Sequence, residues 1–247
     1  LSSGLSNIIV IGSSNSAGSL TSGDNHLLIG HRSGKTMTTS ESMITLGHDT
    51  LQNASNGSSS IFIGHESGKS LTHTYNSLMI GHETGKNAQL SNNNILLGNR
   101  SGKTLATGSE NVLMGIGAGN KMTHSNRNIV IGCEKTDVGE ISAAAASMTT
   151  GNDNIIMGQN VAASLTTGSR NLIVGNRSGE HLNATDDTII LGYYSGSNIR
   201  GGNDEDKQNI IIGNESGQQI TSGKAIIIGH ESGTKATGED LLIIGNK

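Results

Sequence analysis

Short runs of three apolar residues, each followed by glycine, recur along the whole chain. From Gly30 to Gly132 the repeat glycines are 17 residues apart, and longer steps separate Gly132 from Gly158 and Gly192 from Gly213. Runs of Ile, Leu, Val and Met bounded by Gly predict short β-strands. A fixed period of this length indicates a repeat protein. The repeat glycines are Gly12, Gly30, Gly47, Gly64, Gly81, Gly98, Gly115, Gly132, Gly158, Gly175, Gly192, Gly213, Gly229 and Gly245.

A second apolar column lies seven residues after the repeat glycine in most copies. Its members are Met37, Leu71, Leu105, Met122, Leu165, Leu182, Ile199 and Ile220, with Ala54, Ala88 and Ala236 as smaller ones. Helical solenoids need units of roughly 33 to 47 residues, whereas two short strands and two turns fit this period. We therefore predict an all-β fold, a parallel β-roll or β-helix solenoid of about 14 coils. Residues 1–247 form one repeat domain in this prediction, with longer excursions at 134–153 and 197–209.

The middle residue of each apolar triplet is predicted to form an oligomer interface. Side chains alternate along a strand, so if the first and third residues face the second column, the middle one points outward. This middle column contains Val10, Leu28, Phe62, Met79, Leu96, Leu113, Val130, Ile156, Ile173, Ile190, Ile211, Ile227 and Ile243, with Thr45 as its polar exception. A soluble monomer rarely exposes so continuous a stripe. We expect identical subunits to cover it through cyclic symmetry, and a dimer satisfies the pattern as well as a trimer does.

The composition excludes several classes of protein. Hydrophobic residues make up 32% of the chain and there is no Pro, yet the apolar residues are regularly spaced rather than scattered, which argues against disorder. A net charge of −4 with interspersed signs gives no nucleic-acid footprint. The single Cys133 excludes an intramolecular disulfide. No stretch approaches the roughly 20 apolar residues of a membrane span, so we expect no membrane insertion. Because Leu1 falls inside the repeat pattern, we interpret the chain as a fragment or processed piece.

Two segments resemble known repeats. The sequences LTTGSRNLIVGNRSG (Leu165 to Gly179) and LATGSENVLMGIGAG (Leu105 to Gly119) resemble the repeats of phage tail fibres. They are also similar to the YadA-like head repeats of trimeric autotransporter adhesins. Both families form left-handed parallel β-rolls that assemble as trimers and contact host surfaces. Autotransporter heads usually have about 14 residues per coil and a small middle residue, which favours the fibre family here.

The resemblance implies an extracellular homotrimer, located on a virion tail fibre or on a bacterial cell surface. The implied function is a structural and host-recognition segment of a phage tail fibre or spike, with a cell-surface glycan or outer-surface receptor as partner. The head of a bacterial trimeric surface adhesin is the alternative. A glycan-cleaving tailspike is more distant, because the aromatic platforms that such hydrolases use are nearly absent. An ice-binding solenoid is disfavoured because no flat Thr-x-Thr face recurs.

Four histidines occupy the position after the repeat glycine in successive coils. They are His31, His48, His65 and His82, and His230 repeats the position later. Stacked imidazoles could bind a metal or respond to pH. Asn99, Asn176, Asn214 and Asn246 fill the same position elsewhere, which favours a hydrogen-bonding ladder instead. We accordingly predict no metal and no cofactor.

Other candidate sites have simpler interpretations. Gly115–Gly119 lacks the spacing of a dinucleotide-binding loop, and its outer glycines are ordinary repeat positions. The Lys35, Lys69, Lys86 and Lys103 column could attract anionic glycans, but such columns more often form a solvated face. No catalytic set emerges, so we predict that the chain is not an enzyme.

The acidic excursion is the place where we expect recognition, because loops on rigid scaffolds commonly carry binding function. Asn203, Asp204 and Asp206 lie in it, and Tyr193 and Tyr194 adjoin it. Aromatic faces beside acidic and amide groups suit contact with a sugar. Oxygen ligands there could also hold calcium, although the full calcium-loop pattern is absent. The simpler alternative is that Tyr193 only fills the His/Asn position.

Overall fold

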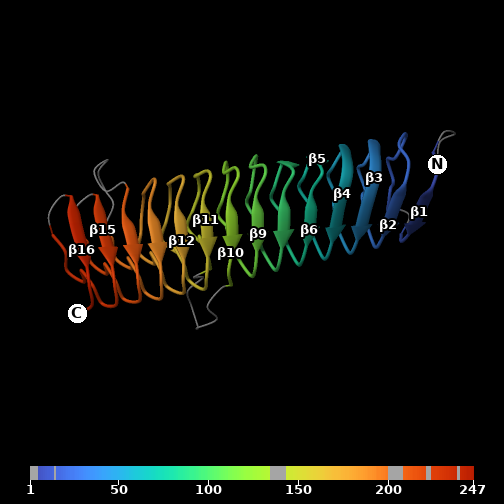
Figure 1. Cartoon of the computed structure of the whole chain (residues 1–247). Coiled ribbons are helices and arrows are strands. Elements are labelled where there is room, and N and C mark those ends of the chain that lie inside the picture. Colours follow the sequence, from blue (N-terminus) through green and yellow to red (C-terminus); the bar gives the residue numbers. More distant parts are fainter. Residues whose placement is uncertain (1–4, 14, 134–142, 200–207, 221–223, 238–239) are drawn as a thin grey trace. The chain divides into compact units, whose positions relative to one another are not determined.

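The chain is a parallel β-solenoid of about 13 turns, and the described residues contain no helix. These features come from a computed structural model, which describes residues 5–13, 15–133, 143–199, 208–220, 224–237 and 240–247. The chain divides into two compact units. Unit 1 comprises residues 1–114 and 122–124, and unit 2 comprises residues 115–121 and 125–247. Each unit is a stack of coils with its strands side by side in chain order (Figure 1).

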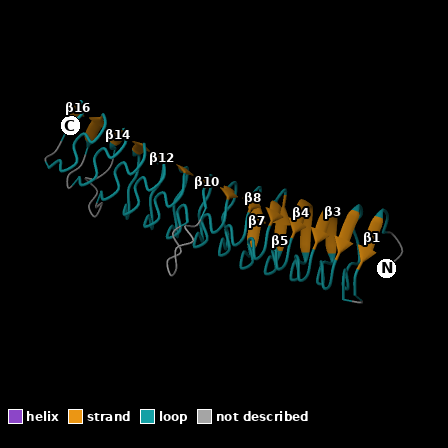
Figure 2. Cartoon of the chain, turned by 90° about the horizontal axis from the view of Figure 1, so that it is seen from below, coloured by secondary structure: helices purple, strands orange, loops and turns teal. Residues whose placement is uncertain are grey.

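Unit 1 has one long ladder in the order β1-β2-β3-β4-β6-β8-β9, in which each pair is parallel. β5 and β7 extend a second ladder from the first half of β4. Outside these strands, loops and turns make up the rest of each coil (Figure 2). The strands are β1 (Ile8–Ile11), β2 (His26–Ile29), β3 (Thr39–Leu46), β4 (Asn56–Ile63), β5 (His73–Tyr75), β6 (Leu78–Ile80), β7 (Leu90–Asn92), β8 (Ile95–Leu97) and β9 (Val112–Met114).

Unit 2 repeats the same ladder from β10 to β16, again with parallel pairs. The triplets pair in register, so that Ile173 is opposite Ile156 on one side and Ile190 on the other. Equivalent side chains therefore form continuous columns. The strands are β10 (Ile129–Ile131), β11 (Ile155–Met157), β12 (Leu172–Val174), β13 (Ile189–Leu191), β14 (Ile210–Ile212), β15 (Ala225–Ile228) and β16 (Leu241–Ile244).

The middle residue of each triplet faces the interior, so the outward orientation predicted from the sequence is wrong. Relative exposure is 0% for Leu28, Phe62, Met79, Leu96, Leu113, Val130, Ile156, Ile173, Ile190, Ile211 and Ile227. In the first and last strands, Val10 is 37% exposed and Ile243 is half-buried. The buried members are core residues, and as such they cannot contact a partner subunit.

The second apolar column lies inside as predicted, and it packs against the middle column. Leu71, Leu105, Leu165 and Leu182 are fully buried. Around Gly179, the side chains of Ile173, Leu182 and Ile190 all come within 3.7 Å of the position that a β-carbon would take. Two facing apolar columns separated by this glycine thus fill each coil. Turning the middle residue outward would leave a void between the two columns, which closely packed interiors do not tolerate.

A hydrogen-bonded pair explains the one polar member of the middle column. Thr45 is fully buried, and its hydroxyl forms a hydrogen bond with that of Ser33, which is buried as well. Both polar groups are therefore satisfied inside the coil, as buried hydroxyls need to be.

The repeat glycine is required by both backbone conformation and space. Gly64 has a φ of +128°, and a β-carbon there would lie 2.3 Å from the carbonyl oxygen of Gly81 in the next coil. Side chains rarely tolerate either condition. The glycine therefore turns the chain sharply at the end of each strand while neighbouring coils remain at strand spacing.

Buried asparagines at the position before the triplet form a ladder of side-chain amides inside the coils. The backbone N–H of Asn171 donates to Asn154 Oδ1 at 3.0 Å, and its Nδ2 donates to Thr185 O at 2.8 Å. Asn171 Oδ1 in turn accepts from the backbone N–H of Thr188 at 3.0 Å. The side-chain amide of Asn171 thus satisfies two backbone groups of the next coil, and the amide of the preceding coil satisfies the backbone N–H of Asn171. The ladder stabilises the turn that enters each strand.

Candidate interaction surfaces

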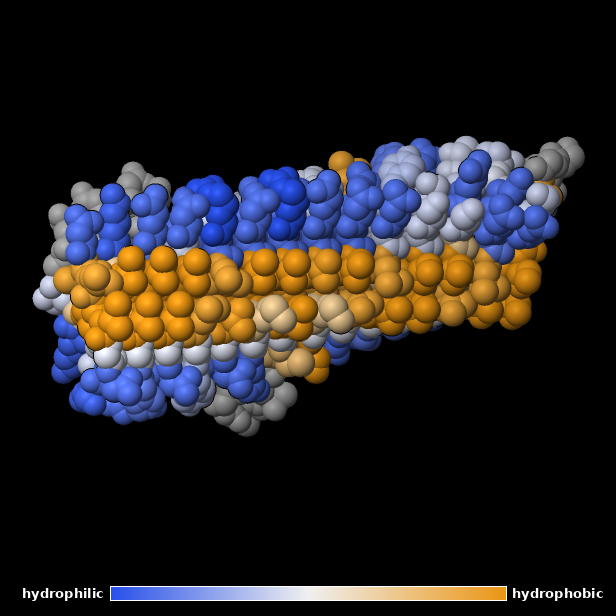
Figure 3. Space-filling view, in the orientation of Figure 1, coloured by the Kyte–Doolittle hydropathy of each residue, from blue (hydrophilic) through white to orange (hydrophobic). Residues whose placement is uncertain are grey.

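The first and third residues of every triplet point outward and form the surface that we call the apolar face. In unit 1 this face consists of Ile9, Ile11, Leu27, Ile29, Ile44, Leu46, Ile61, Ile63, Leu78, Ile80, Ile95, Leu97, Val112 and Met114. In unit 2 it consists of Ile129, Ile131, Ile155, Met157, Leu172, Val174, Ile189, Leu191, Ile210, Ile212, Ile226, Ile228, Leu242 and Ile244. No member is buried, and no member is polar. In each unit the face appears as an uninterrupted orange band (Figure 3).

The exposure of this face is substantial even in the middle of each stack. Ile95 is 39% exposed in unit 1, and Ile155 is 39% exposed in unit 2. Single exposed apolar residues are ordinary, whereas an unbroken apolar patch rimmed by polar residues marks an interaction site. The sequence correctly indicated an apolar outer stripe but assigned it to the wrong residues. The apolar face has two columns rather than one.

Charged pairs border the apolar face in unit 2. Arg127 donates from Nε and Nη2 to Asp153 at 2.6 and 2.9 Å, and Arg170 makes the equivalent pair with Asp187 at 2.5 and 2.8 Å. All four residues precede the triplet by two positions and have φ values of 54–61°. Because they are bidentate, these pairs fix the geometry of the rim more firmly than single contacts would.

A chain of ion pairs runs along the coils of unit 1. Lys86 Nζ lies 2.5 Å from Glu66 Oε2 and 2.7 Å from Glu83 Oε1, and Lys103 Nζ lies 2.8 Å from Glu83 Oε2. Hydrogen bonds from the lysines lower the pKa of Glu66 and of Glu83 to about 2. The predicted lysine column is thus largely paired with carboxylates, and this pairing removes much of its attraction for anionic glycans.

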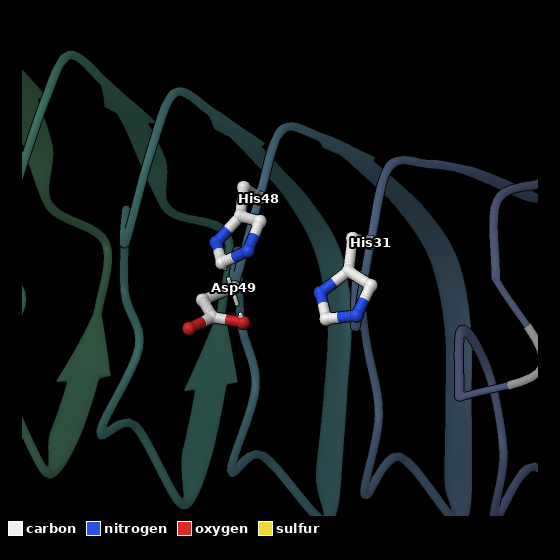
Figure 4. A group of neighbouring side chains, drawn as sticks. All are labelled: His31, His48 and Asp49. Atoms are coloured by element: carbon white, nitrogen blue, oxygen red, sulfur yellow. Dashed lines mark ion pairs between the residues drawn. The ribbon is translucent and has the colours of Figure 1, made fainter.

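The predicted histidine column is a stack of parallel rings. Ring centroids are 4.8 Å apart between His31 and His48, 5.3 Å between His48 and His65, and 5.2 Å between His65 and His82. Neighbouring planes differ by 9–18°. All four rings are exposed. Asp49 lies beside the first two rings (Figure 4), and the ligand atoms of His31, His48 and Asp49 are all within 4.8 Å of one another.

The two tyrosines form a small aromatic surface. Their ring centroids are 6.2 Å apart, and the guanidinium carbon of Arg177 lies 4.9 Å from the centre of the Tyr194 ring. Tyr193 is 49% exposed, and its backbone N–H donates to Asn214 Oδ1. Asn203, Asp204 and Asp206, which we expected beside these rings, lie outside the described residues. The sugar-contact prediction therefore stays a prediction.

The glycine-rich segment 115–119 has the same conformation as the other repeat turns. Gly115, Gly117 and Gly119 have φ values of 124°, 70° and 56°, and no helix follows within the described residues. The geometry is that of a turn between coils.

The fold and these surfaces define a parallel β-solenoid repeat protein with a continuous apolar face in each unit. No family model, curated protein or solved structure matches the chain. Among the described residues, no helix has the length and apolar character needed to cross a membrane.

Proposed function

We propose that the chain is a non-enzymatic structural and host-recognition segment of an extracellular fibre, and that it assembles as a homotrimer through the apolar face. The observation that carries the proposal is the apolar face itself, which is apolar at both outward positions of all fourteen triplets. The hydrophobic effect strongly favours covering such a surface. Two further copies of the chain present apolar faces of the same length and with the same spacing between residues.

The two-column form of the face suits three-fold symmetry. In a ring of three copies, each subunit contacts two neighbours, so one column can pack against each. In a two-fold pair, both columns meet the same partner. The resemblance of the segments 105–119 and 165–179 to trimeric fibre repeats supports the three-fold choice and the fibre context.

Assembly through this face can be tested by comparing neighbouring residues of one strand. Ile155 points outward and Ile156 is buried. We expect Ile155→Lys together with Leu172→Lys to shift the mass measured by light scattering from trimer towards monomer, while the circular dichroism of the coils persists. Ile156→Ala is the matched control, since it should lower stability without removing a contact between copies. A wild-type monomer at micromolar concentration would refute the proposal.

Host recognition and the absence of catalysis need separate assays. We expect the assembled protein to bind intact host cells or an immobilised surface glycan without releasing sugar products. Release of oligosaccharide would instead identify a tailspike hydrolase. Tyr194→Ala tests whether the tyrosine pair contributes to binding, with Tyr75→Ala, at a position distant in sequence, as its control. In the full-length protein, a membrane anchor would favour the bacterial adhesin and a tail-attachment domain the phage fibre.

A further inference from the structure

We propose that the stacked histidines of unit 1 bind divalent transition-metal ions such as Zn²⁺, Ni²⁺ or Cu²⁺. The ligands are the imidazole nitrogens of His31, His48, His65 and His82. Neighbouring rings act in pairs, so the ladder holds up to two ions. Imidazole is a preferred ligand for each of these metals.

The histidines differ from the asparagines that fill the same column. Asn176 Oδ1 accepts from the backbone N–H of Gln159 at 3.0 Å, and Asn246 Oδ1 accepts from that of His230 at 3.0 Å. These amides tie one coil to the next. Among the described residues, the rings of His31, His65 and His82 have no hydrogen-bonding or ionic partner, and each is stacked on a neighbouring ring of the column. The histidines therefore do not serve the ladder function of asparagine, and their nitrogens are available.

The spacing of the rings is close to what a shared ion requires. Two nitrogens at about 2.0–2.1 Å from one ion are at most about 4.2 Å apart. The centroids of His31 and His48 are 4.8 Å apart, and their lone pairs lie in the two ring planes, so both rings must turn out of the stack for two nitrogens to converge on one ion. That rotation is accessible because both side chains are exposed.

Asp49 supplies the carboxylate that commonly lies beside a metal-binding histidine. Its Oδ1 lies 3.5 Å from His48 Nδ1, and its side chain is only 4% exposed. Arg32 contacts both carboxylate oxygens, at 2.6 and 2.7 Å, which fixes the carboxylate (Figure 4 shows its place beside the rings). A metal-binding histidine commonly directs its other ring N–H to a carboxylate. Asp49 thus favours the tautomer of His48 that carries its proton on Nδ1 and leaves the Nε2 lone pair for a metal ion.

The test is titration calorimetry of the assembled protein with ZnCl₂ and, separately, NiCl₂, in a buffer that does not bind metal. All variants carry Cys133→Ser, because that exposed thiol could bind the same ions. We expect the parent to bind up to two ions per chain. Replacing all four ladder histidines with Asn should weaken binding at least tenfold. Asn occupies this column naturally at 99, so the fold should be retained, as thermal unfolding will check.

Two further variants make the outcome specific. His65→Asn leaves only the His31–His48 pair intact, so the stoichiometry should fall from two to one. The control, His124→Asn with His181→Asn, removes histidines outside the ladder and should leave binding unchanged. Equal metal affinity of the parent and of the variant that lacks all four ladder histidines would overturn the proposal. So would equal losses of metal affinity in the ladder variants and in the control variant. If the variant that lacks all four ladder histidines does not fold, His65→Asn and the control with His124→Asn and His181→Asn decide the question.

Discussion

The ring of Phe62 packs directly against the α-carbon of Gly68, six residues later in the same coil. A β-carbon at position 68 would lie 2.7 Å from both Cδ1 and Cε1 of the ring and 2.9 Å from Leu71 Cδ1. The glycine has a φ of +61°, so its conformation and its lack of a side chain are both used. Phe62, the only phenylalanine of the chain, is thus a core residue. Its ring occupies the space that a side chain at position 68 would need.

Phe62→Ala should therefore destabilise the coil as a core truncation does. We expect a loss of about 3–5 kcal/mol. Because repeat coils need not unfold in a single step, hydrogen–deuterium exchange of the amides around β3, β4 and β6 is the appropriate measurement. Ile63→Ala, at the outward neighbour, should affect exchange less in the monomer. Equal effects of the two changes would contradict the inward orientation of Phe62.

The sequence alone was sufficient for the repeat, the parallel stacking and the second apolar column, because period and glycine positions report directly on backbone geometry. It was insufficient for the orientation of the triplets. In a triplet such as Ile155, Ile156 and Met157 all three residues are apolar, so the alternation that usually separates the faces of a strand carries no signal.

Two features of the sequence point to the correct orientation. The position before the triplet, for example Asn154, has the same parity as the middle residue and is asparagine in many repeats. Asparagines that bond from coil to coil at this position must point into the interior. Because side chains alternate along a strand, the middle residue of the triplet, two positions later, points into the interior as well. The glycine four positions after the repeat glycine also implies a bulky partner opposite. The ring stacking of the histidines, in contrast, depends on side-chain rotamers that no spacing rule fixes.

Removing one rung of the asparagine ladder should be costly. In Asn171→Ala, the backbone N–H of Thr188 and the carbonyl of Thr185 each lose the hydrogen bond that the Asn171 amide makes to them. Losing these two buried hydrogen bonds corresponds to a loss of about 2–4 kcal/mol in unfolding free energy. Asn171→Thr is the matched comparison, since Thr188 occupies the equivalent position of the next coil. Denaturant titration should rank the threonine variant closer to wild type, and the reverse order would exclude the ladder as the cause.

The repeat glycine should not tolerate alanine. At Gly64, an added β-carbon would meet the Gly81 carbonyl at 2.3 Å in a backbone conformation that strongly disfavours side chains. Strain of this kind costs at least about 2 kcal/mol. Gly18→Ala is the control, because its nearest neighbour would be 3.6 Å away and its φ is not in the left-handed region. A melting temperature equally affected by both substitutions would show that the contact between glycines is not restrictive.

Acid should weaken the ion-pair chain of unit 1. The folded-state pKa of Glu83 is about 2, well below its ordinary value of 4.5, because Lys103 and Lys86 donate to it. Its contribution to stability is therefore complete above pH 4.5 and is lost as the pH falls towards 2. Glu83→Gln should flatten the stability profile across that window. A profile as steep as that of wild type would show that the pair contributes little.

His26 should make unit 1 sensitive to milder acid. This ring occupies the position of the ladder asparagines and is 2% exposed. Its Nδ1 accepts from the Met43 N–H at 3.3 Å, and its Nε2–H donates to Ser40 O at 2.9 Å. Burial lowers the pKa of His26 below its usual 6.5, although the Ser40 hydrogen bond and the nearby Asp24 and Glu41 carboxylates act in the opposite direction.

A lowered folded-state pKa means that the unfolded chain takes up the proton first. The stability supplied by neutral His26 is thus complete above about pH 6.5 and is lost progressively as the pH falls through the folded pKa. His26→Asn restores the ladder residue and removes the titrating group, so the variant should lose less stability than wild type between pH 7 and 5. Unfolding curves at several pH values measure this difference. Because the other histidines are common to both proteins, superimposable pH profiles would show that His26 does not titrate differently on folding.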